Sequence, residues 1–259
     1  MALGGTKKMS RGTSRAVVMG IIAGAVASSA WATDVGMPTY STDIGKNANL
    51  EVYYEKYERD IEMTGLGETT TGKQEENRFM ARINYNASTR ASLHAEVGAT
   101  DSDQSDGAVP IFGVGLKIKA YDSEALDLTV FASGSYVTEI EYSEDGYVDY
   151  YVDVPDYSQK ESYFEINGGL AISRLVQLDE KTTCTPYGGF MVSKLDGDED
   201  YELKYHDGTT LSESGDIKDD GVFSIFAGLG LTMDKTFGVR LEGRFVNQTS
   251  FSAGLMYFF

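Results

Sequence analysis

The feature that most constrains the fold of this chain is a two-residue alternation of apolar and polar side chains, repeated segment after segment. Successive side chains of a β-strand point to opposite faces, so each segment has one apolar face. The 3.6-residue spacing of amphipathic helices is almost absent beyond the N-terminal region. The clearest rows are Phe79/Ala81/Ile83/Tyr85, Leu126/Leu128/Val130/Ala132 and Phe251/Ala253/Leu255/Tyr257/Phe259. The sequence therefore predicts an all-β protein.

We count about ten candidate strands of this kind, with eight as the alternative because the segments at 49–57 and 185–194 are weakly patterned. The other segments lie near residues 79–85, 91–99, 111–120, 126–132, 164–172, 223–231, 237–245 and 250–259.

The connections between these segments alternate in length. Short ones fall at 86–90, 121–125, 176–183 and 233–236, and long polar ones at 59–77, 101–108, 139–162 and 195–221. A soluble sandwich has no reason to sort its turns by side. Short periplasmic turns, longer extracellular loops and an even strand count are typical of a closed antiparallel transmembrane β-barrel.

Closure has a physical cause. Hydrocarbon offers no partner to a bare N–H or C=O group, so a sheet in lipid must pair its first strand with its last. The apolar rows would then face lipid, and the aromatic residues Tyr257 and Phe259 would lie in the interfacial girdle.

The first thirty-two residues predict export. Lys7, Lys8, Arg11 and Arg15 precede an apolar run at 16–30, and Ala30-Trp31-Ala32 has the small residues of a signal-peptidase site. The run is shorter than the roughly 20 residues of a membrane-spanning helix. We therefore expect a signal peptide at 1–32 and a single barrel domain at 33–259.

The mature chain is strongly acidic. It keeps 18 Lys and Arg against 40 Asp and Glu, a net charge of −22. Such a surface argues against nucleic acid as a partner, because binding would require basic residues to neutralise phosphate. The lone Cys184 cannot form an internal disulfide.

The signal peptide, the alternating strands, the Pro-Tyr-Gly-Gly-Phe stretch at 186–190 and the final Tyr-Phe-Phe together resemble the small outer-membrane β-barrel superfamily, which includes the outer-membrane-protein-A-like and opacity-type porin-like barrels. The resemblance implies localisation in the outer membrane of a Gram-negative cell envelope. It also implies that the barrel-insertion machinery reads the last strand, with Tyr257 and Phe259 as the assembly signal.

The rows opposite the apolar ones carry charges of both signs. In a narrow barrel such side chains meet across the lumen and pair. The predicted ion network comprises Arg78, Arg82, His94, Glu96, Lys117, Glu165, Arg240, Glu242 and Arg244. Glycines on the same rows, at 113, 115, 169, 228 and 230, would thin the wall and favour a narrow porin-like channel as the alternative to a plugged lumen.

Two arrangements suggest a hydrolase. Ser92, His94 and Glu96 share one face of a strand, but alternate residues lie about 6.6 Å apart, too far for a proton relay. Asp101 with Asp103, and His206 with Asp207, partly resemble the site of the omptin outer-membrane proteases, although Lys204 stands where that family has an aspartate. We predict no catalytic residues and no enzyme.

The long loops concentrate acid. Residues 139–162 hold eight Asp and Glu against one Lys, and 194–220 hold ten against three. Asp196, Asp198 and Asp200 partly match a calcium loop, so a weakly bound divalent cation is the one candidate cofactor. A tyrosine cluster suits a surface that binds a ligand: Tyr142, Tyr147, Tyr150, Tyr151 and Tyr157.

The sequence thus predicts an integral outer-membrane barrel with a structural or surface-interaction role and a lumen plugged by ion pairs. Its expected partners are outer-membrane lipid, the insertion machinery and a surface ligand at the loops. A narrow channel is the alternative, and an omptin-like protease is the third candidate.

Overall fold

The computed structural model describes residues 36–38, 45–65, 68–102, 107–144, 147–149, 152–154, 156–219 and 222–259. The expected signal peptide at 1–32 lies outside these residues and stays a prediction. No helix within the described ranges is long and apolar enough to cross a bilayer, a result that has no bearing on β-barrels.

Ten long antiparallel strands form the wall of the molecule. They are β1 (Ala48–Gly65), β2 (Glu68–Asn86), β3 (Ala91–Ser102), β4 (Val109–Asp122), β5 (Asp127–Glu144), β8 (Asp156–Ser173), β10 (Thr182–Lys204), β12 (Val222–Met233), β13 (Phe237–Val246) and β14 (Gln248–Phe258). The shorter elements are β6 (Tyr147–Asp149), β7 (Val152–Val154), β9 (Val176–Gln177) and β11 (Thr210–Lys218).

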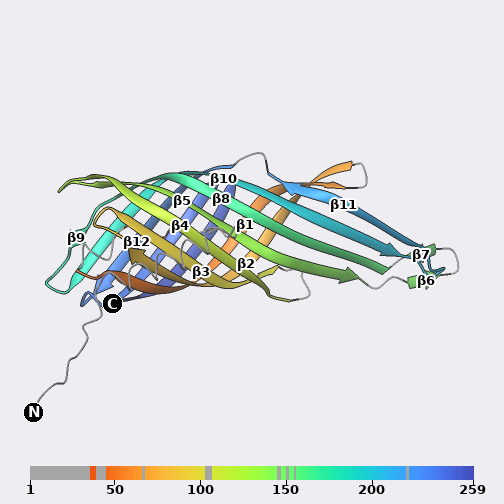
Figure 1. Ribbon diagram of the computed structural model, residues 1–259, viewed down its shortest axis with the longest axis horizontal. Helices are drawn as coiled ribbons and strands as arrows, with labels where there is room; N and C mark the ends of the chain where they lie inside the picture. Colours follow the sequence, from red (N-terminus) through yellow and green to blue (C-terminus); the bar gives the residue numbers. More distant parts are fainter. Residues whose placement is uncertain are drawn as a thin grey trace, which may run out of the picture.

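The sheet closes on itself because β1 pairs with β2 on one edge and with β14 on the other. Every other strand of the ten pairs with its neighbours in the chain order, and Figure 1 shows them strongly tilted along the long axis of the molecule. The seam ends in two backbone bonds, 3.2 Å from Ala48 N to Phe259 O and 3.0 Å from Phe259 N to Ala48 O. The structure confirms the ten-stranded closed barrel and excludes the eight-stranded alternative.

Burial in this barrel is inverted relative to a soluble protein. Large apolar side chains lie on the outside, for example Leu255 at 66% exposed and Phe79 at 63%, while all five fully buried arginines lie inside. This inversion is what a bilayer imposes, since hydrocarbon surrounds the outer face. The predicted apolar rows are therefore the lipid-facing surface.

The long connections predicted as loops are mostly continued strands. β1 and β2 stay paired from Ala48 and Tyr85 up to Gly65 and Glu68, and β10 runs for 23 residues. At about 3.3 Å per residue, a tilted strand of this length rises well beyond the roughly 25 Å apolar band. Outward side chains turn polar at Lys56, Lys160 and Lys194, which marks where the wall leaves the membrane.

β11 is the largest departure from the predicted loops. It lies within 195–221, pairs with β10 from Asp196 to Lys204, and also pairs with Glu62–Thr64 of β1. Because β12, β13 and β14 are short, β11 closes the wall above them. Figure 1 shows β11 on the far side of the barrel from the C-terminus.

The short turns predicted for the periplasmic side lie together on the rim that also holds the C-terminus. One of them, at Asp234 and Lys235, has φ values of 50° and 54°, the left-handed geometry that suits a right-twisted hairpin. We therefore take this rim as periplasmic and the opposite end, with β6, β7 and β11, as extracellular.

Charge placed on the lipid face should destabilise the barrel. Leu241 is outward-facing and midway along β13. Replacing it with arginine should cost about 2–4 kcal/mol, the usual cost near the bilayer midplane. The measurement is the urea midpoint of the barrel folded into phospholipid vesicles.

The matched control is Glu202→Arg, on the outer face of β10 above the membrane. It should leave the midpoint nearly unchanged. Equal losses from the two variants would mean that Leu241 does not face hydrocarbon.

Candidate functional site: the charged lumen

β1 supplies one side of the lumen with a row of inward side chains. Glu51, Tyr53, Glu55, Tyr57 and Arg59 are each at most 1% exposed. They alternate with outward residues such as Leu50 and Val52. A strand was predicted here, but this row was not part of the predicted ion network, although its alternation is present in the sequence.

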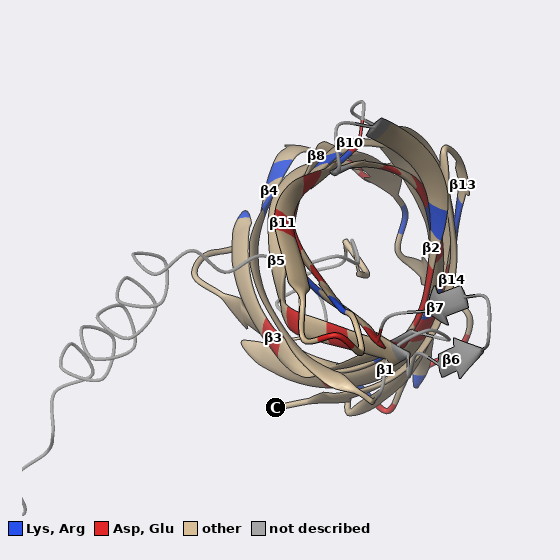
Figure 2. Ribbon diagram, turned by 90° about the vertical axis from the view of Figure 1, so that its right-hand side faces the viewer, with Lys and Arg blue, Asp and Glu red and all other residues tan. Residues whose placement is uncertain are grey.

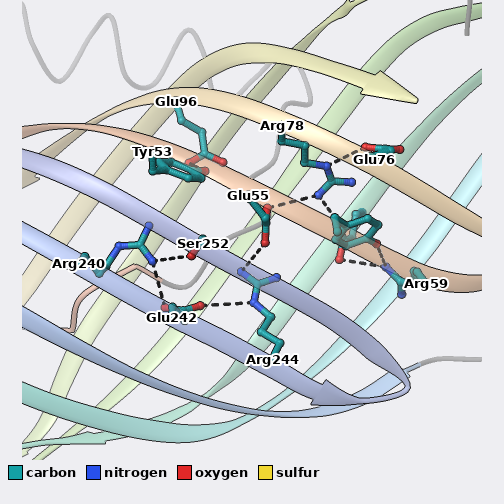
Figure 3. Close-up of polar contacts among 12 residues, drawn as sticks. Tyr53, Glu55, Arg59, Glu76, Arg78, Glu96, Arg240, Glu242, Arg244 and Ser252 are labelled. Carbon is teal, nitrogen blue, oxygen red and sulfur yellow. Dashed lines mark hydrogen bonds and ion pairs between the residues drawn. The ribbon is translucent and has the colours of Figure 1, made fainter. Parts of the chain in front are cut away.

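The central part of the network lies around Glu242 of β13. This carboxylate is 3.5 Å from Nη1 of Arg240 and 3.4 Å from Nε of Arg244. Arg240 also reaches Glu51 at 2.5 Å and donates to Ser252 Oγ at 3.0 Å. Figure 3 shows Glu242 between the two arginines.

A second part lies nearer the extracellular end. Arg78 contacts Glu76 at 2.8 Å, and its Nη1 is 3.8 Å from Glu55 and 3.9 Å from Glu165. Its guanidinium carbon sits 3.7 Å from the centre of the Tyr57 ring. The arrangement surrounds one arginine with carboxylates and an aromatic face, which compensates its loss of hydration.

Arg59 joins the network to the extracellular hairpins. It is 2.9 Å from Glu165, and it also pairs with Asp219, which follows β11. Asp219 Oδ1 in turn accepts a 3.1 Å bond from the backbone N–H of Leu195 on β10. The ion network thus fixes the base of the β10–β11 hairpin.

Arg82 forms the third part of the network, with Glu96 at 2.7 Å. The Tyr53 hydroxyl donates to the same Glu96 at 2.9 Å. The Tyr53 ring lies between Arg82 and Arg240, at 4.9 Å and 5.3 Å from their guanidinium carbons. This ring therefore separates two like charges.

The structure brings seven of the nine predicted network residues into these contacts: Arg78, Arg82, Glu96, Glu165, Arg240, Glu242 and Arg244. His94 and Lys117 are buried in the lumen too, but Lys117 Nζ donates to the backbone oxygen of Met37 at 3.3 Å. The predicted network did not include Glu51, Glu55, Arg59, Glu76 and Asp219. Arg59, Glu76 and Asp219 fall in segments predicted as loops.

Three of the inward glycines lie against bulky side chains. The space beside Gly115 holds the His94 ring, the space beside Gly228 holds the Tyr187 ring, and the space beside Gly230 holds the Met37 side chain. A Cβ atom at any of these positions would force the neighbouring side chain to shift. The sequence feature that most favoured a channel is thus a packing feature.

Apolar clusters lie in the barrel interior on both sides of the ion network. Toward the periplasm, Met37 packs with Phe131, Tyr187, Phe226 and Phe258. Toward the extracellular end lie Ile61, Ile111, Val137, Ile140, Leu195 and Ile217. The cavity beside Met37, lined also by Glu51 and Lys117, has a volume of about 10 Å³. That is room for one water molecule.

Above the membrane, Glu161 of β8 lies directly opposite Glu199 of β10. Both are buried, and Gln159 donates to both carboxylates, at 2.5 Å to Glu161. Burial and the neighbouring Glu199 charge raise the pKa of Glu161 to about 7. Burial also raises the pKa of Glu199.

The predicted calcium-like residues lie on a strand and not in a loop. Asp196, Asp198 and Asp200 alternate along the outer face of β10, where Asp196 contacts Lys194 at 3.2 Å and Asp200 accepts a bond from Ser214 at 2.7 Å. Across the described ranges, no group of three His, Cys, Asp or Glu residues is arranged to hold a metal ion.

The tyrosine cluster is only partly a surface. Tyr142 packs against the extracellular apolar cluster, and Tyr157 lies half-buried with its ring centre 6.4 Å from that of Tyr201. Tyr150 and Tyr151 lie outside the described residues, as does the side chain of Tyr147.

The residues considered for catalysis do not form a described site. Ser92, His94 and Glu96 lie along β3, and Glu96 is engaged by Arg82 and Tyr53. Asp101 ends β3, whereas His206 and Asp207 form the β10–β11 turn, and Asp103 lies outside the described residues.

The protein is a closed antiparallel β-barrel with an apolar outer face. No family model matches its sequence, and no curated protein matches it. Among solved structures it is similar to the translocator domain of autotransporter NalP from Neisseria meningitidis, with 13% identity, 95% of this chain and 97% of that chain covered, and a TM-score of 0.49.

Two further similar structures are the outer membrane protease OmpT from Escherichia coli and the outer membrane protein OprG from Pseudomonas aeruginosa. OmpT has 13% identity over 82% of this chain and 97% of that chain, with a TM-score of 0.48. OprG has 10% identity over 83% and 96%, with a TM-score of 0.37. At these identities the likeness concerns architecture and not what any of these proteins does.

Removing one member of the buried network should be costly. Arg240→Ala would leave Glu51 and Glu242 without this cation, and breaking such a buried pair typically costs about 3–5 kcal/mol. We expect a loss of that size in the urea midpoint of the folded barrel. Lys181→Ala, which removes a surface pair with Asp234 at 3.3 Å, is the control and should cost at most about 1 kcal/mol. A loss no larger than the control's would mean that the network does not stabilise the barrel.

Stability should fall as pH rises through the titration range of Glu161. Between its ordinary pKa of 4.5 and the folded value of about 7, the folded protein holds a proton that the unfolded chain has released. The unfolding free energy should therefore drop by roughly 3 kcal/mol from pH 4.5 to pH 7 and then level off. Glu161→Gln should reduce this slope in urea titrations, leaving the smaller contribution of Glu199, and exposed Glu202→Gln should keep it. An unchanged slope in Glu161→Gln would assign it to other groups.

Proposed function

We propose that this protein is a sealed outer-membrane barrel with a structural and surface-interaction role and no catalytic cycle. The observation that supports the proposal is that buried side chains occupy the barrel interior. Five arginines and their carboxylate partners occupy its middle, and apolar clusters cover both ends. Figure 2, viewed along the barrel axis, shows acidic and basic positions distributed around the ring of strands.

A sealed lumen fits the energetics of the network. Water in a wide channel would hydrate these charges separately, and pairing across the lumen would then contribute little. In a lumen without water, each charge needs the partners that Glu242 and Glu165 provide. The same contacts that stabilise the wall therefore oppose conduction.

The surface-interaction role rests on the extracellular extension of the strands. Its outer face exposes carboxylates on several strands, and the residues are Asp60, Glu139, Glu141, Asp198, Asp200 and Glu202. An acidic wall of this kind suits cationic ligands and repels anionic ones. The tyrosines that face inward are not part of this surface.

The terminal strand supports a role in assembly. Tyr257 and Phe259 are about half exposed on the outer wall, with ring centres 6.1 Å apart. They are accessible to an insertion machinery before lipid covers them, while the backbone of Phe259 completes the seam.

Single-channel recording in planar bilayers tests the sealed lumen. We expect no steady openings from the wild-type barrel, whose folded insertion is verified by heat-modifiable migration on a denaturing gel. Arg244→Ser, which removes a lumen side chain, should produce detectable openings, whereas Lys194→Ser on the outer wall should not. Steady wild-type openings whose conductance changes in Arg240 or Arg244 variants would instead establish the narrow channel.

A further inference from the structure

The outer wall carries a groove at the periplasmic rim, between β8 and β10 and beside the turn that leads into β5. Its volume is about 440 Å³, and its lining includes Leu126, Ile172, Pro186 and Gly188, with Arg174 at its edge. Tyr187 also lines the groove, although its hydroxyl donates to Glu242 in the lumen at 2.8 Å. None of the charged residues of the ion network lines the groove.

The local sequence explains why the wall is hollow here. β8 and β10 remain paired down to Ser173 and Tyr187. Below that point the ladder continues through a 3.2 Å bond from Arg174 N to Pro186 O and through the pairing of β9 with Thr183 and Cys184 of β10. Pro186 has no N–H group to donate, so the ladder lacks one bond at this position. Gly188 then leaves the outward face without a side chain.

The groove opens toward lipid. Ile172 is 53% exposed and Leu126 is 38% exposed, and both belong to the outward apolar rows. Leu175 and Leu178, at 38% and 58% exposed, continue the apolar surface below them. The bilayer already removes these side chains from water. A partner from the aqueous phase would therefore bury no additional apolar surface by binding them.

Arg174 supplies the one charge that lines the groove. It is exposed and forms no ion pair within the described part of the chain. It stands just below the apolar band, at the depth of lipid headgroups on the periplasmic side. Other cations of this rim are partly engaged, such as Lys181 with Asp234.

We propose that this groove binds a glycerophospholipid of the periplasmic leaflet. One acyl chain would lie in the groove against Ile172 and Gly188, and the phosphodiester would pair with the guanidinium of Arg174. The volume falls within the roughly 300–1,000 Å³ of ordinary ligand pockets. A guanidinium matches phosphate oxygens with two parallel N–H donors.

The charge and the groove favour phospholipid over other occupants. A peptide would need unpaired backbone groups, but β10 below Tyr187 is already paired with β9 on one side and β12 on the other. A phospholipid needs only an apolar surface and one partner for its phosphate. Ile172 supplies the apolar surface, and Arg174, next on the same face of the chain, supplies the phosphate partner.

Native mass spectrometry of the full barrel, released from detergent with added phosphatidylglycerol or diacylglycerol, tests the proposal. We expect one retained phosphatidylglycerol per wild-type barrel and about fivefold weaker retention in Arg174→Gln. Arg90→Gln, in the exposed turn between β2 and β3, is the matched control and should retain the lipid as the wild type does. Diacylglycerol, which lacks the phosphate, should bind weakly and equally to all three.

A second variant tests the groove itself. Ala125→Trp places a large ring at the exposed edge of the groove and should reduce retention of phosphatidylglycerol while leaving heat-modifiable migration unchanged. Equal retention by the wild type, Arg174→Gln and Ala125→Trp would overturn the proposal, as would no retention by the wild type. A sealed or open lumen does not affect these outcomes.

Discussion

The structure depends on the pairing of backbone groups around a closed ring. In hydrocarbon each unpaired N–H or C=O group costs several kcal/mol, so the seam between β1 and β14 is as necessary as any interior pair. The chain satisfies this condition to its last residue, where Ala48 and Phe259 exchange two bonds. Closure by the terminal strand links folding to the C-terminus, because the ring is incomplete until that strand is in place.

Closure also decides where charge can go. Because the outer face is in lipid, charged side chains within the membrane can lie only in the lumen. A ten-stranded barrel is narrow enough for side chains from opposite walls to make contact. Glu242 on β13, Glu51 on β1 and Glu96 on β3 therefore share three arginines and two tyrosines. The glycines at 115, 228 and 230 admit bulky neighbours into the same space. Charge pairing and shape complementarity thus act together to fill the barrel.

The sequence predicted the wall well and the extracellular half poorly, for one physical reason. Within the membrane, lipid contacts the outer face of the wall and polar groups contact the inner face, so apolar and polar side chains alternate strictly along each strand. Rows such as the one at 237–245 therefore predict strands correctly. Above the membrane both faces meet polar surroundings, and the alternation fades. Segments such as Thr210–Lys218 then look like loops although they form β11. Glu76, Asp219 and Glu199 were missed for this reason. The N-terminal contact of Met37 had no sequence signal, because a single apolar residue near a chain end has no periodicity.

The interior of the extracellular extension differs from the membrane-embedded interior in its balance of acidic and basic side chains. In the membrane every arginine has carboxylates within reach, but Glu161 and Glu199 face each other across β8 and β10 with an amide and no cation between them. A like-charge pair directly opposite on a sheet is destabilising unless one member is protonated. The pKa of about 7 for Glu161 means that the upper barrel changes its charge near neutral pH. Since β11 pairs with both β10 and β1, any strain from that charge acts on the strand that closes the upper wall.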